Sequence, residues 1–159
     1  MPEIIHAHVP FPQIEQHLDF MMTQNVHPEI FFSGEVLDDL IPEQLESVAA
    51  SLAAAAVSCT IHAPFMDLNP GSDEHLLREV TRRRFQQVCH AASILRPKVM
   101  VFHPGYDRWR YGEKQISWLK HSLDSFKEVL DATKESGCII AIENIFEEEP
   151  STLPLSAKT

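Results

Sequence analysis

The sequence predicts an α/β fold in which the strands of a parallel sheet alternate with helices. Apolar residues recur with a strand-like period in some segments and with a helical period in the segments between them. The last three strand-like runs are almost continuously apolar, as expected where helices cover a parallel sheet. The resulting order, β-α-β-α-β-α-β-α-β, fits either a doubly wound sheet or part of a (β/α)8 barrel, and periodicity does not choose between them.

The individual elements follow from these runs. Strands are expected at residues 4–9, 29–33, 59–65, 98–103 and 138–145. Helices are expected at about 13–24, 42–55, 73–95 and 116–130, with Ser72 as the N-cap of the third. Neither GxGxxG nor GxxxxGK(S/T) occurs, and the sequence holds only five glycines. This removes the commonest reason to favour a nucleotide-binding doubly wound sheet.

Charge and composition exclude several classes of partner. Thirteen basic residues against twenty-three acidic ones give a formal net charge of −10, which repels phosphate backbones, so nucleic acid is not an expected partner. No apolar run reaches the roughly 20 residues that cross a bilayer. Cys59, Cys89 and Cys138 are too widely spaced for a CxxC pair, and they indicate reduced thiols in a cytoplasmic protein.

Three of the expected strands end in a side chain that can bind metal: His62, His103 and Glu143. One βα unit separates each from the next, and the carboxyl ends of neighbouring parallel strands meet at the same rim. Two imidazoles and a carboxylate are ligands that zinc and similar divalent ions accept. A lone histidine in an apolar strand is usually structural, but Glu143 is costly to bury without a partner. As a set, the three predict a metal or catalytic site.

Other polar residues lie close to these strand ends. Asp67, Tyr106 and Asp107 follow the site strands, so we expect them to contact a substrate. His6 and His8 share one face of the first strand, where they either line a barrel or form hydrogen bonds in the rim or core.

The segments Ile-His-Ala-Pro-Phe at 61–65, Val-Phe-His-Pro-Gly at 101–105 and Ala-Ile-Glu-Asn at 141–144 resemble the xylose isomerase-like TIM barrels. That superfamily includes sugar and sugar-phosphate isomerases and epimerases, and the endonuclease IV-type apurinic endonucleases of AP endonuclease family 2. The resemblance implies a TIM (β/α)8 barrel in which His62, His103 and Glu143 bind Zn, Mn or Mg.

The same resemblance implies a partial barrel. A whole barrel takes about 250 residues, and the further ligands that the family draws from strands six to eight have no counterpart here. We therefore expect about five strands and four helices over residues 1–146, followed by a tail at 147–159 without predicted structure.

Three functions are compatible with these observations. The first is a divalent-metal-dependent sugar or sugar-phosphate isomerase or epimerase, in which Glu143 is both a ligand and a proton-transfer group. The second is an endonuclease IV-like apurinic endonuclease. The third is an inactive half-barrel that needs a partner or self-associates through unpaired strand edges.

Overall fold

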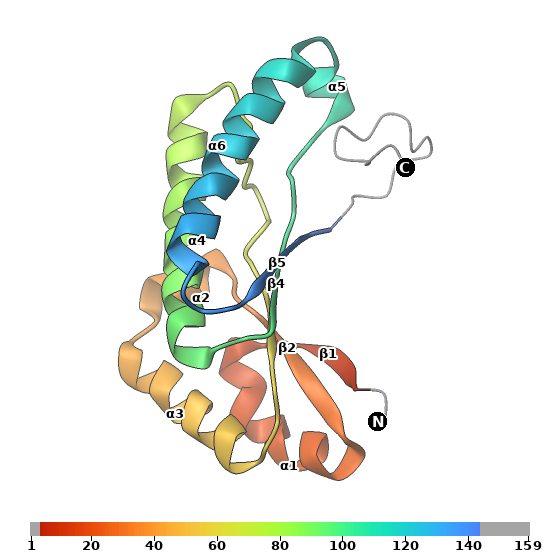
Figure 1. The fold of residues 1–159 in the computed structure, drawn as a ribbon, viewed down its shortest axis with the longest axis vertical. Coiled ribbons are helices and arrows are strands. Elements are labelled where there is room, and N and C mark those ends of the chain that lie inside the picture. The colour runs from red at the N-terminus through yellow and green to blue at the C-terminus, as the bar shows by residue number, and fades with distance from the viewer. Residues whose placement is uncertain (1–3, 144–159) are drawn as a thin grey trace.

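A computed structural model describes residues 4–143 and shows one five-stranded parallel sheet (Figure 1). The strands are β1 (Ile5–Pro10), β2 (Val26–Phe31), β3 (Thr60–His62), β4 (Val99–Phe102) and β5 (Ile139–Ile142). Their order in the sheet is their order in the chain. A doubly wound sheet reverses its order at a switch point, so the unbroken order identifies the sheet as part of a barrel and confirms that prediction.

Helices follow each of the first four strands. They are α1 (Ile14–Gln24), α2 (Gly34–Asp39), α3 (Pro42–Ala54), α4 (His75–Leu95), α5 (Arg108–Tyr111) and α6 (Gln115–Thr133), with 3-10 turns η1 (Phe11–Gln13) and η2 (Gly112–Lys114). Right-handed crossovers between neighbouring parallel strands place their helices on one side of the sheet, and Figure 1 shows α3, α4 and α6 along one side. No helix in this described part of the chain is long and apolar enough to cross a membrane.

Two helices, two strands and one cap differ from the sequence prediction. Strand β2 is Val26–Phe31 against the predicted 29–33, and β3 is Thr60–His62 against the predicted 59–65. The helices α2 and α5 have six and four residues, too few to show a helical period, so they were not expected. The predicted N-cap of α4, Ser72, is wrong. Helix α4 begins after Glu74, whose carboxylate accepts from the backbone N–H of Leu76 at 3.1 Å. The Ser72 hydroxyl instead accepts from the N–H of Glu74, so it stabilises the turn before the helix.

The two faces of the sheet differ sharply in polarity. A row of apolar residues crosses all five strands on the face toward the helices, with neighbours in register: Val9, Ile30, Ile61, Met100 and Ile140. The side chains of the middle three are fully buried, which stabilises each by about 1.5–3 kcal/mol relative to exposure. The core therefore lies between the sheet and its helices.

The opposite face, which lines the barrel interior, carries polar side chains on β1, β2 and β3 and apolar ones on β4, where Val99 and Val101 lie. His8, Glu29 and Thr60 lie in register across β1, β2 and β3 on this face. His62 lies one step further toward the carboxyl ends, between Phe31 and Val101. Because successive residues of a strand face opposite sides, the pattern that buries the apolar row also presents these polar groups together.

One buried asparagine connects the loops at the carboxyl ends of β3 and β4. Asn69 Nδ2 donates to the carbonyl oxygen of Gly105 at 2.7 Å and to the hydroxyl of Tyr111 at 3.3 Å. Its Oδ1 accepts from the N–H of Gly71 and from Nε1 of Trp118, both at 3.0 Å. We call these five residues the Asn69 clasp. It fixes the chain that leaves β3 relative to the chain that leaves β4.

Gly105 is required by the backbone at that clasp. Its φ of +65° lies in the left-handed region, which is open to glycine. A Cβ at this position would also lie 2.8 Å from the carbonyl oxygen of Leu68. The Pro104–Gly105 turn is therefore held close to the loop after β3.

Candidate metal centre

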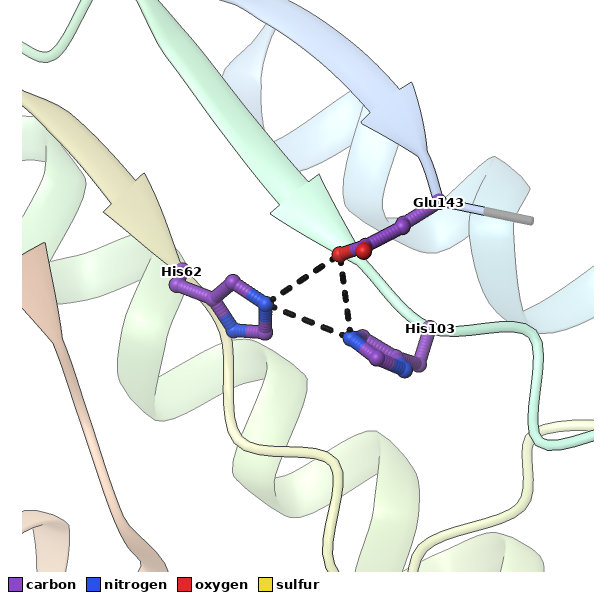
Figure 2. A group of neighbouring side chains, drawn as sticks. All are labelled: His62, His103 and Glu143. Carbon is purple, nitrogen blue, oxygen red and sulfur yellow. Dashed lines mark hydrogen bonds and ion pairs between the residues drawn. The ribbon is translucent and has the colours of Figure 1, made fainter. Parts of the chain in front are cut away.

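The three strand-end side chains reach the same point from three neighbouring strands (Figure 2). His62 is the last residue of β3, and His103 and Glu143 directly follow β4 and β5. Backbone hydrogen bonds of 2.9 Å from Ala63 N to Val101 O and from Glu143 N to Phe102 O continue the ladder past the ends. The sheet itself thus holds the three side chains side by side.

The three donor atoms form a nearly equilateral triangle. His62 Nε2 and His103 Nε2 are 3.2 Å apart. Glu143 Oε2 lies 3.4 Å from the first and 3.2 Å from the second. Bonds of about 2.0–2.1 Å in a tetrahedral zinc site place neighbouring ligand atoms about 3.3–3.4 Å apart. The spacing of these atoms therefore matches one face of such a coordination tetrahedron.

The tautomer of His62 is set by its other ring nitrogen. His62 Nδ1 lies 3.1 Å from the carbonyl oxygen of Ala63, which can only accept. We assign the hydrogen to Nδ1 on that contact, so the lone pair of Nε2 faces the triangle. Histidine ligands of metals usually donate their second N–H in this way, which fixes the ring and raises its basicity.

Electrostatics within the triangle favour a cation at its centre. His62 is buried. The pKa of His103 lies below its usual value, first because His103 is itself partly buried and second because the His62 ring is close, while Glu143 acts in the opposite direction. Both Nε2 atoms and the carboxylate oxygen can offer lone pairs to a cation that lies between them. The donor set therefore fits a divalent ion.

Aromatic rings surround the two histidines. Phe65 stacks on His103 with centroids 4.2 Å apart and planes inclined by 14°. The same ring meets His62 edge-on at 5.3 Å, and Phe31 approaches His62 at 5.9 Å. These contacts orient both imidazoles and exclude water from one side of the triangle.

The structure adds a neighbouring pair that sequence reasoning missed. His8 Nδ1 lies 3.8 Å from Glu29 Oε1, and the His8 ring is 5.8 Å from that of His62. His6 lies on the same face of β1, 5.7 Å from the ring of His27. Both β1 histidines thus line this interior face, one of the two placements considered. Glu29 could be found only from the register between β1 and β2, which the sequence does not supply.

The three residues predicted to contact a substrate lie in three different environments. Asp67 is exposed in the loop after β3, at a positive φ of 58°. Tyr106 is buried and packs edge-to-face on Trp118 at 4.8 Å. The Asp107 carboxylate caps α5 by accepting from the N–H of Trp109 at 2.9 Å. Tyr106 and Asp107 thus have structural contacts, and the substrate role of all three stays a prediction.

Within residues 4–143, no other group of three His, Cys, Asp or Glu side chains lies close enough to share a metal ion. The further ligands that the resemblance would supply have no counterpart in these residues. The predicted tail at 147–159 and the domain boundary at 146 lie outside the described residues. If it held an ion, the triangle would leave coordination positions for water or substrate.

Comparison with known proteins places this geometry in context. Residues 19–154 match the family described as xylose isomerase-like TIM barrel. The uncharacterized protein MJ1311 of Methanocaldococcus jannaschii is 31% identical over 91 residues, which are 56% of this chain and 30% of that protein. With a second relative matched over 34% of its length, the chain spans about a third of the curated relatives it matches.

Solved structures show the same fold. The TTHB071 protein of Thermus thermophilus, solved with soaking in ZnCl2, superimposes with a TM-score of 0.79 at 20% identity over 96% of this chain and 60% of that one. The 3-keto-D-glucoside 4-epimerase YcjR of E. coli gives 0.67 at 16% identity, over 91% and 57%. Endonuclease IV of Thermus thermophilus gives 0.59 at 17% identity, over 90% and 52%.

Proposed function

Because the chain belongs to the xylose isomerase-like TIM-barrel family, we propose that it carries part of the active site of a divalent-metal-dependent sugar or sugar-phosphate isomerase or epimerase. The observation that carries the proposal is the triangle of His62, His103 and Glu143, whose donor atoms are spaced as a cation requires. The likeness in fold to an epimerase supports it. The activity proposed is that of the whole protein.

The residues of the triangle suggest a division of roles. His62 Nε2, His103 Nε2 and the Glu143 carboxylate would hold Zn, Mn or Mg, and the bound ion would polarise a carbonyl or hydroxyl oxygen of the sugar. Both histidine contacts of Glu143 use Oε2, and this side chain is 53% exposed. Oε1 therefore remains available to accept a proton from the hydroxyl-bearing carbon adjacent to the sugar carbonyl.

Binding and turnover can be tested separately. Competition with a chromophoric chelator should give a divalent-ion affinity that His62→Ala and His103→Ala each lower by about 100-fold or more. His90→Ala, which removes an exposed histidine of α4, is the matched control. Unchanged affinity in both triangle variants would rule out this site.

Turnover is measured on the full-length protein loaded with Mn2+ or Co2+. We expect NMR to detect isomerisation or epimerisation of at least one member of a ketose and ketose-phosphate panel. Absence of turnover, together with chelator-sensitive incision of an abasic oligonucleotide, would instead favour the endonuclease alternative. We rank that alternative second because a net charge of −10 opposes binding of DNA.

A further inference from the structure

A cavity opens at the rim of the sheet, beside the triangle of His62, His103 and Glu143. Its volume is about 220 Å3, and it lies between the loops that follow β2 and β3 and the first turns of α4. Phe31 and Phe65 form part of its wall, and both rings also contact His62. Whole-ligand pockets usually measure roughly 300–1,000 Å3. This space, which we call the rim cavity, is therefore suited to part of a ligand whose remainder lies at the triangle.

The rim cavity is lined by two charged side chains of opposite sign, Arg84 and Asp67. Arg84 is engaged by both carboxylate oxygens of Asp38, and this pair lowers the pKa of Asp38 and raises that of Arg84. Asp67 then determines the net charge of the wall, which is negative.

We propose that the rim cavity is a substrate subsite for the neutral, hydroxylated portion of a sugar, and that it disfavours phosphorylated sugars. The inference rests on the proposed function, and it narrows the substrate from sugars and sugar phosphates to sugars without a phosphate at this end. A phosphate here would face Asp67 and find Arg84 already paired.

The remaining wall offers what a sugar needs. The rings of Phe31 and Phe65 line the cavity and supply apolar surface for the C–H side of a pyranose or furanose. Ser33 Oγ accepts from the N–H of Val36 at 3.2 Å, so its own hydrogen is left to donate. The Asp67 carboxylate accepts from sugar hydroxyls. Donor, acceptor and apolar wall thus converge on one hydroxylated ring.

Methionine methyl NMR reports on this cavity directly. Met66 lines the rim cavity and is 71% exposed, whereas Met21 and Met100 are buried elsewhere and serve as internal references. The full chain labelled with 13C at methionine methyls is titrated with D-fructose and D-fructose 6-phosphate. We expect a saturable shift of the Met66 signal with D-fructose, at an affinity about tenfold higher than for the phosphate.

Asp67→Asn tests the charge without disturbing the backbone, since asparagine tolerates the positive φ at this position. We expect it to reduce the preference for D-fructose over its phosphate by about tenfold. Asp39→Asn, which removes the same charge from a side chain that does not line the rim cavity, should leave the preference unchanged. Equal or tighter binding of the phosphate, or no Met66 shift with either probe, would overturn the proposal.

The titration is repeated in EDTA, so that this inference and the proposed function can fail independently. A D-fructose response of Met66 that persists in EDTA, in a protein without metal-dependent turnover, would retain the subsite and reject the isomerase. Metal-dependent turnover with an Asp67→Asn variant that keeps the wild-type preference would reject the subsite alone.

Discussion

At the scale of single residues, Glu143 has a double effect on the triangle. Its Oε2 lies 3.4 Å from His62 Nε2 and 3.2 Å from His103 Nε2. Without a cation, the carboxylate can accept a hydrogen bond from an imidazole that carries its hydrogen on Nε2. With a cation, the same three atoms would become ligands. One carboxylate can therefore serve both the metal-free and the loaded protein.

Glu143→Gln separates these two effects. The amide can donate to an imidazole lone pair, so we expect the melting temperature in EDTA to stay the same or rise slightly. The increase in melting temperature that Zn2+ produces by binding the folded state should largely disappear. Thermal unfolding with and without Zn2+ measures both. Glu135→Gln, at an exposed site after α6, should keep the wild-type increase; its loss there would indicate a non-specific effect.

His6 makes stability depend on pH. Burial, and then the neighbouring His27 and Lys98, hold the pKa of His6 below its usual 6.5. The folded state therefore binds fewer protons than the unfolded state below about pH 6.5, so stability falls as pH decreases from there. Above that pH this contribution is constant.

We expect urea unfolding in EDTA to show a smaller loss of stability between pH 7.5 and pH 5.5 in His6→Gln than in the wild type. His17→Gln, which changes an exposed histidine of α1, should lose as much as the wild type. A His6→Gln variant with the full wild-type loss would contradict the assignment to His6.

At the scale of elements, the Asn69 clasp determines where the loops after β3 and β4 lie. Asn69→Ala removes four side-chain hydrogen bonds and leaves Trp118 Nε1 buried without this acceptor. We expect it to lower the free energy of unfolding by roughly 3 kcal/mol. Because His103 directly precedes the Pro104–Gly105 turn, metal affinity should fall as well.

Urea unfolding and chelator competition check the two effects. Gln86→Ala, which truncates an exposed amide on α4, should change neither quantity measurably. An Asn69→Ala variant of wild-type stability would show that the clasp does not hold the loops.

The parts of the fold and of the site that can be predicted from the sequence are those that leave a local sequence pattern. Long elements such as α4 and α6 carry several turns of apolar periodicity, so the sequence predicts them well. The strand ends at His62 and His103 also follow from it, because a parallel sheet brings them to one rim. The partners of Glu29, Phe65 and Asn69 depend on register and loop path, which no local pattern encodes.

At the scale of the whole molecule, the described sheet ends in two edges with exposed apolar side chains. Among residues 4–143, β1 and β5 each pair with a strand on one side. Ile5 and Ile139 at these edges are 63% and 64% exposed. Unpaired strands with exposed apolar side chains favour edge-to-edge association. This is the arrangement expected of a half-barrel that pairs with another chain.

We therefore expect the chain of residues 1–159 to self-associate, with a sedimentation coefficient that rises with protein concentration. Ile139→Lys places a charge at the β5 edge and should shift the distribution toward the monomer. Ile116→Lys adds the same charge at an exposed position of α6 and should not. A monomer at every concentration would argue against association through the edges.

The clasp also links two positions that are far apart in the sequence. A Cβ at Gly71 would lie 2.4 Å from Nε1 of Trp118. The indole of Trp118 therefore occupies the space that a side chain at position 71 would need. A larger residue at position 71 therefore requires a smaller one at position 118. Across descendants of this sequence, positions 71 and 118 should therefore evolve as a coupled pair, and a change at either alone should be selected against.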